Sequence, residues 1–176
     1  MKKQILTLVF LMSIWNTVCA LNLSGTVFEK VGLEKDIDPH ILYAIALAES
    51  AYSPHKKSRG ASPYPWTIRL PDRPIYLTSK NDAERELDRI LKYTSHVDVG
   101  LMQVNVRWHK HRVKNVKDLL DPETNIRIAA DILIENLKRY PNDLIAALGS
   151  YHSSTPDRRN RYGLTVYYIY KNLKKP

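Results

Sequence analysis

Glu49 is the residue of this sequence best placed for proton-transfer chemistry. Apolar side chains recur at helical spacing before it, and Glu49 follows Ile45 by four residues on the same stripe. A carboxylate on a buried helix face loses hydration, and near the helix C-terminus it meets the negative end of the helix dipole. Both effects favour the protonated carboxyl, so the pattern predicts a group that acts as an acid near neutral pH. The competing interpretation is a solvated glutamate at a fraying helix end.

The stretch 98–105 carries a second group of polar side chains. Gly100 allows the backbone to approach a neighbouring segment, and the amides of Gln103 and Asn105 suit the hydroxyl and acetamido groups of sugars. Asp98 is the obvious second carboxylate. A structural role for Asp98 is favoured, however, because an aspartate next to a turn glycine commonly bonds its own backbone. Taken alone, the stretch is equally consistent with an ordinary buried turn.

Capping residues and prolines mark the helices that would position these groups. Asp38 and Pro39 predict the start of the helix that carries Glu49, and Pro54 predicts its end. A short packing helix that ends near Gly32 is predicted before it, from apolar residues at helical spacing: Val27, Phe28, Val31 and Leu33.

Four more helices are expected further along the chain. One is capped by Thr78 or Ser79 and runs to about residue 92, and the others cover about 121–140, 143–151 and 157–172. Asn125, early in the second of these, is predicted to be a structural hydrogen-bonding residue. Tyr162 and the other tyrosines of the last helix are expected to serve packing.

Residues 55–97 differ in composition from the segments on either side. Trp66–Leu70 and Ile75–Leu77 are predicted to be the strands of a small hairpin, with a proline-flanked turn between them. This segment is expected to be an insertion at the edge of a mainly α domain.

The N-terminus has the features of a secretory signal peptide. Lys2 and Lys3 precede an apolar run, and small residues at 18–20 predict cleavage after Ala20. Residues 1–20 are therefore expected to be removed and 21–176 to form one domain in the periplasm or cell envelope, although an uncleaved anchor remains an alternative.

The single cysteine, Cys19, would leave with the signal, which excludes thiolate catalysis and thiolate metal sites. No metal-ligand spacing and no phosphate-binding glycine loop is found, so no metal or cofactor is expected.

The chain is strongly basic, with a formal net charge of +9. Such a charge predicts attraction to polyanions, and for an exported chain these are anionic cell wall or lipid headgroups rather than nucleic acid. The densest basic run lies over residues 107–117. The simplest interpretation of that run is a solvated surface, and no sequence-specific binding of nucleic acid is expected.

Four motifs stand in a fixed order along the chain: Ala48-Glu49-Ser50, Gly100-Leu101-Met102-Gln103, Asn125 with Ala129, Ala130 and Leu133, and the segment Ala147 to His152. Together they resemble the soluble lytic transglycosylases with a goose-type lysozyme fold. The Pro-Trp segment 63–67 and its spacing to Asp98 look most like the small exported enzymes of that family that accompany conjugative transfer and type IV secretion systems.

The resemblance implies a mainly α, lysozyme-like domain that acts on peptidoglycan. Glu49 would be the sole catalytic acid and base, cleaving the bond between N-acetylmuramic acid and N-acetylglucosamine with formation of 1,6-anhydro ends. The implied substrate-binding residues are Ser50, Gln103, Asn105, Tyr151 and His152. Tyr151 would reach toward the carboxylate. His152 stands where the family most often has asparagine, which leaves its role open.

Two alternatives remain at this stage. The same fold could hydrolyse the same bond, with Asp98 as a second carboxylate that positions water. The chain could also be a module that binds peptidoglycan or a secretion complex without cutting, through the basic run and the hairpin at Trp66.

Overall fold

The computed structural model describes residues 20–53 and 60–175. Of the predicted signal peptide only Ala20 lies within these residues, and Pro54 lies outside them. None of the helices within the described ranges is long and apolar enough to cross a membrane.

The described chain is mainly helical, as predicted. The elements are α1 Val27–Lys35, α2 Pro39–Ser50, α3 Lys80–Leu91, α4 Val106–His109, α5 Pro122–Arg139, α6 Leu144–Ser150 and α7 Pro156–Leu173, with two 3₁₀ turns at Lys110–Arg112 and Val116–Leu120. The predicted cap at Ser79 is confirmed, because its side chain accepts a hydrogen bond from the first turn of α3. The side chains of Asp121 and Asp143 cap α5 and α6 in the same way. The expected boundaries of α1, α2, α3, α5, α6 and α7 hold within a few residues, whereas α4 and the two 3₁₀ turns were not predicted.

Two small antiparallel sheets complete the fold. β1 (Ala51–Tyr52) pairs with β2 (Ser62–Pro63), a pairing that the sequence did not predict. The predicted hairpin is confirmed, with a first strand shorter than predicted, β3 (Thr67–Arg69), and a second strand shifted by one residue, β4 (Pro74–Tyr76). A second hairpin, formed by β5 (Asp98–Val99) and β6 (Val104–Asn105), joins it to give the order β4-β3-β5-β6. The segment that carries β3 and β4 is thus built into the sheet that carries the polar stretch 98–105.

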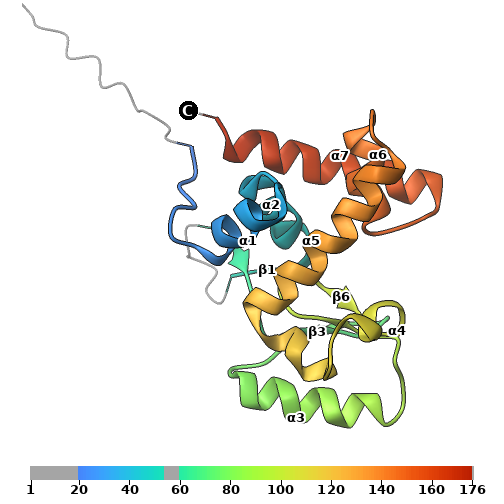
Figure 1. The fold of residues 1–176 in the computed structure, drawn as a ribbon. Coiled ribbons are helices and arrows are strands. Elements are labelled where there is room, and N and C mark those ends of the chain that lie inside the picture. Colours follow the sequence, from blue (N-terminus) through green and yellow to red (C-terminus); the bar gives the residue numbers. More distant parts are fainter. Residues whose placement is uncertain (1–19, 54–59, 176) are drawn as a thin grey trace, which may run out of the picture.

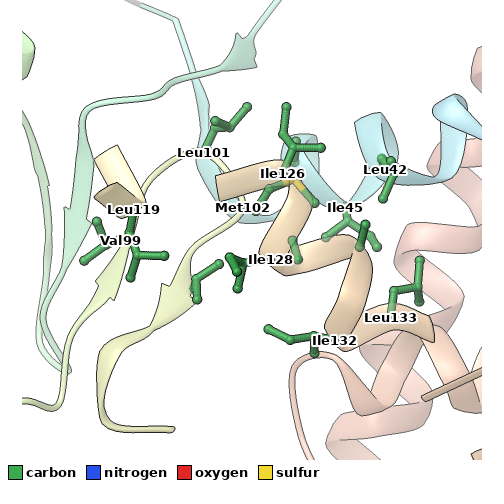
Figure 2. Close-up of a cluster of buried hydrophobic side chains, with 14 of the residues drawn as sticks. Leu42, Ile45, Val99, Leu101, Met102, Leu119, Ile126, Ile128, Ile132 and Leu133 are labelled. Atoms are coloured by element: carbon green, nitrogen blue, oxygen red, sulfur yellow. The ribbon is translucent and has the colours of Figure 1, made fainter. Parts of the chain in front are cut away.

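Helix α5 runs through the middle of the molecule, between α6 and α7 on one side and the sheet with α3 on the other (Figure 1). Figure 2 shows Ile45 of α2, Met102 of the β5–β6 loop and Ile126 of α5 in one cluster of buried side chains. Burial of such side chains contributes about 1.5–3 kcal/mol each. The core therefore fixes α2 against the β5–β6 hairpin, the two elements that carry the candidate site.

One residue of α1 that was predicted to pack against the core is exposed instead. Phe28 and Val31 are buried, but Leu33 is 75% exposed. Leu33 lies two residues after Val31, a spacing that turns a side chain to the opposite face of a helix. Its exposure follows from helical geometry, and the prediction that it packs is wrong.

Candidate active site

Helix α2 is held at its first turn by the C-terminal helix α7. Asp38 caps α2 by accepting from the His40 backbone N–H at 2.9 Å, and it also accepts from Tyr170 at 3.0 Å and Lys174 at 2.8 Å. Burial raises the pKa of Asp38, but these hydrogen bonds outweigh that effect and hold the pKa at about 2. The predicted cap therefore also docks α7 alongside α2.

Glu49 lies in the last turn of α2, with its side chain only 12% exposed. The Tyr162 hydroxyl of α7 donates to Glu49 Oε1 at 2.6 Å. Among the described residues, no hydrogen bond engages the second oxygen, Oε2. The position near the buried face and near the helix C-terminus is as the sequence predicted. One carboxyl oxygen is thus fixed, and the other is available to a ligand.

Tyr162 was expected to serve packing; it does pack against the core, but the prediction missed its hydrogen bond to Glu49. Burial and the nearby charge of Glu49 raise the pKa of Tyr162 well above its usual value, so its hydroxyl keeps its proton and remains a donor. The available sequence signal was its position four residues before the buried Val166. A tyrosine on a buried helix face needs an acceptor for its hydroxyl.

His152 also contacts the Glu49 carboxylate. Its ring stacks on Tyr162, with ring centroids 4.7 Å apart and planes 3° from parallel, and its Nδ1 lies 3.8 Å from Glu49 Oε1. The attraction of Glu49 raises the pKa of His152, while partial burial and Arg158 oppose this. At 3.8 Å the contact is an ion pair and is too long for a hydrogen bond.

Asp98 faces the same space from the β5–β6 hairpin. Its Oδ1 accepts from Asn105 Nδ2 at 2.6 Å across the hairpin, where the sequence had favoured a bond to its own backbone. Burial raises the pKa of Asp98; the bond from Asn105 opposes that rise, and the charge of Glu49 adds to it. Asn105 also caps α4 by accepting from the Trp108 backbone N–H at 3.3 Å. Both side chains are therefore engaged within the hairpin.

The loop of this hairpin depends on a close approach between Gly100 and Asn125. Gly100 has φ = 82°, and a Cβ there would stand 2.4 Å from Asn125 Nδ2 and 2.6 Å from the Leu119 carbonyl oxygen. Asn125 is fully buried, donates to the carbonyls of Val99 and Leu119, and accepts from the Met102 backbone N–H. The predicted close approach at Gly100 and the predicted structural role of Asn125 are confirmed.

Two residues implied to bind substrate or reach the carboxylate have other partners. Ser50 is 1% exposed and donates to the Leu101 carbonyl oxygen at 2.6 Å, so it joins α2 to the hairpin and does not line the cleft. The Tyr151 hydroxyl donates to the Met102 carbonyl oxygen at 2.8 Å. The tyrosine hydroxyl that bonds the carboxylate of Glu49 is that of Tyr162.

Gln103 lines the cleft in a constrained conformation, with φ = 48°. Its amide nitrogen donates to the Gly100 carbonyl oxygen at 2.6 Å and to that of Thr67 at 3.3 Å. Its buried amide oxygen has no partner within the described residues. The Gln103 side chain thus braces the hairpin, and its contact with a glycan stays a prediction.

These side chains surround one cleft of about 480 Å³. It is lined by Ala48, Glu49, Arg69, Asp98, Gln103, Val104, Asn105, Trp108, His109, Ile132, Tyr151, His152 and Tyr162. The described residues contain no cluster of three His, Cys, Asp or Glu that could hold a metal ion. The arrangement can move a proton at Glu49 and can present amides, a phenol and an exposed indole to a polar ligand.

Comparison with known proteins agrees with this geometry. No curated protein matches the chain. The family model described as the Transglycosylase SLT domain matches residues 26–165, which span α1 to most of α7. The chain therefore belongs to the SLT transglycosylase family, the lytic transglycosylases of lysozyme-like fold that act on peptidoglycan.

Proposed function

We propose that Glu49 is the sole acid and base with which this lytic transglycosylase cleaves the β-1,4 bond between N-acetylmuramic acid and N-acetylglucosamine. The observation that carries the proposal is the setting of its carboxyl group. Glu49 is nearly buried at the cleft, one oxygen is held by Tyr162 at 2.6 Å, and the other has no partner among the described residues. A fixed, poorly hydrated carboxyl group suits proton transfer to a bound substrate.

The proposed reaction uses the same proton site twice. Protonated Glu49 donates its proton to the glycosidic oxygen as the bond to the anomeric carbon breaks, and the acetamido oxygen of the muramic acid bonds that carbon. Ionised Glu49 then removes the proton of the C6 hydroxyl, whose oxygen displaces the acetamido oxygen. A 1,6-anhydro ring forms, no water is consumed, and Glu49 is protonated again. Because the substrate supplies the nucleophile, no second carboxylate is needed.

The other side chains of the cleft would hold the sugars. Asn105, Tyr151, His152 and Gln103 line the cleft and carry hydrogen-bonding groups. Ser50 would act at a distance, because its bond to the Leu101 carbonyl fixes the hairpin relative to Glu49. Tyr162 would orient the carboxyl group.

A second candidate reaction is hydrolysis of the same bond, favoured by the presence of Asp98 in the same cleft. Asp98 would have to present its carboxylate to water, whereas its Oδ1 accepts from Asn105, the residue that also caps α4. These features favour the transglycosylase reaction. Mass spectrometry of the fragments released from peptidoglycan by purified protein tests the choice: anhydro ends are expected, and reducing ends alone would mean hydrolysis.

The setting proposed for the reaction is the cell envelope, where the enzyme would open the wall locally for a conjugative or type IV secretion apparatus. The apolar run after Lys2 and Lys3 supports export, and the resemblance of segment 63–67 to the transfer-associated enzymes supports the apparatus. Cell fractionation should place the protein in the periplasm, shortened by residues 1–20. A transfer role requires that loss of the protein reduces transfer and that Glu49→Gln fails to restore it.

A further inference from the structure

A second pocket of about 440 Å³ adjoins the cleft along helix α7. It shares Ala48, His152 and Tyr162 with the cleft, and its other lining residues are Arg158, Arg161 and Thr165. These three residues follow the helical spacing that brings side chains to one face. All three are exposed. The pocket is thus an open, basic extension of the cleft that begins beside Glu49.

The two arginines of this pocket are not neutralised within the described residues. No hydrogen bond or ion pair engages the guanidinium of Arg158 or Arg161 there, and the adjacent Asp157 lines a different pocket. Arg159 between them points elsewhere and donates to Tyr140. The positive charge of Arg158 lowers the pKa of His152, which places that charge close to the cleft.

The basic run 107–117, the densest in the sequence, offers a contrast. Arg112 forms a two-pronged ion pair with Glu135 at 2.8 Å, and Lys117 pairs with Asp88 at 2.7 Å. Part of that charge is therefore used within the protein. Arg158 and Arg161 of α7 carry fewer charges than the basic run, but both charges remain available to a ligand next to Glu49.

We propose that Arg158 and Arg161 bind carboxylates of the peptide stem attached to the N-acetylmuramic acid at Glu49. This inference rests on the proposed function. In that reaction the sugar whose anomeric carbon lies beside Glu49 is the one that carries the stem, so the stem leaves the cleft close to the shared residues His152 and Tyr162. Stem peptides carry free carboxylates, and a guanidinium binds a carboxylate through two parallel hydrogen bonds.

The experiment compares three glycan substrates: strands with intact stems, strands from which an amidase has removed the stems, and strands whose stem carboxylates have been amidated. The measurement is KM for release of glycan fragments. We expect the wild-type KM for intact strands to be about tenfold lower than the KM for the other two substrates. A tenfold ratio corresponds to the net binding free energy of one hydrogen bond to a charged group. Arg158→Gln/Arg161→Gln should lose this difference, and Arg158→Lys/Arg161→Lys should retain part of it.

The matched control is Lys138→Gln/Arg139→Gln, which removes the same charge from exposed positions that line neither pocket. This control should keep the wild-type preference. Equal loss in the control would mean that net charge, not the pocket, attracts the substrate, and would overturn the proposal. A preference that survives amidation of the carboxylates would overturn it as well. Absence of anhydro ends from all three substrates would instead sink the proposed reaction, whatever the preference.

Discussion

The two walls of the cleft each carry a carboxylate, but they hold it in different ways. On the helical wall, Glu49 accepts from Tyr162, a residue 113 positions away, and His152 stacks on that tyrosine. On the hairpin wall, Asp98 accepts from Asn105, only seven positions away. The carboxylate of the helical wall is therefore held by a distant segment, whereas the carboxylate of the hairpin wall is held within one hairpin.

This difference separates a group that can exchange a proton from one that supports structure. The bond to Asn105 ties Asp98 to the residue that also caps α4. Glu49 supports no helix cap or turn, and its second oxygen is free of partners within the described ranges. The chemical role is thus expected on the helical wall and the shaping role on the hairpin wall.

Replacing each carboxylate in turn by the matching amide is the strongest test of the difference between the two walls. Glu49→Gln should lower kcat by at least about 10³-fold, because general acid–base catalysis contributes on that order. The matched change Asp98→Asn keeps an oxygen that can accept from Asn105 and should cost less than about tenfold. Steady-state rates of fragment release check both. Comparable losses in the two variants would restore the two-carboxylate hydrolase as the better description.

The hairpin wall should be more sensitive than the helical wall to a change of backbone shape. Gly100→Ala places a Cβ against Asn125 and the Leu119 carbonyl at a positive φ, and we expect a loss of about 2–4 kcal/mol in unfolding free energy. Gly25→Ala is the control, since Gly25 has φ = 74° but open space around it. It should lose only about 1 kcal/mol. Urea unfolding measures both, and equal losses would show that the contact with Asn125 is unimportant.

Sequence reasoning was accurate where the determinants were local. Asp38 and Pro39 predicted the start of α2, the prolines around 71–74 predicted the β3–β4 turn, and Gly100 predicted a close approach. These depend on caps, turns and φ values, which a few neighbouring residues decide.

The same reasoning failed where distant segments meet. Tyr162 was assigned to packing, because periodicity identifies the buried face of a helix without saying what that face touches. The resemblance implied that Tyr151 reaches toward Glu49; burial and the charge of Glu49 raise the pKa of Tyr151, but its hydroxyl donates to the Met102 carbonyl oxygen. The pairing of β3 with β5, which joins the β3–β4 hairpin to the site, was missed for the same reason.

Removing the long-range bond of the helical wall tests whether that assembly matters for chemistry. Tyr162→Phe keeps the ring that stacks on His152 but leaves Glu49 without its donor. We expect kcat to fall about tenfold with little change in KM, because a misoriented carboxyl group transfers its proton less efficiently. Tyr168→Phe, at a 63% exposed tyrosine of the same helix, should leave the rate unchanged. A wild-type kcat in Tyr162→Phe would show that the bond does not orient Glu49.

The smallest expected effect concerns the ion pair between His152 and Glu49, which exists only while the imidazole is charged. Because Glu49 raises the pKa of His152 above its ordinary 6.5, the charged ring stabilises the fold fully below that pH. This contribution is lost as the pH rises through the raised pKa. His152 is half-exposed, so the contribution should not exceed about 1 kcal/mol. While Glu49 is ionised, the unfolding free energies of wild type and His152→Asn should therefore differ most just below pH 6.5 and converge above the raised pKa of His152. His111→Asn, outside the cleft, should show no such convergence, and a pH-independent difference for His152→Asn would mean that stacking on Tyr162 is its whole contribution.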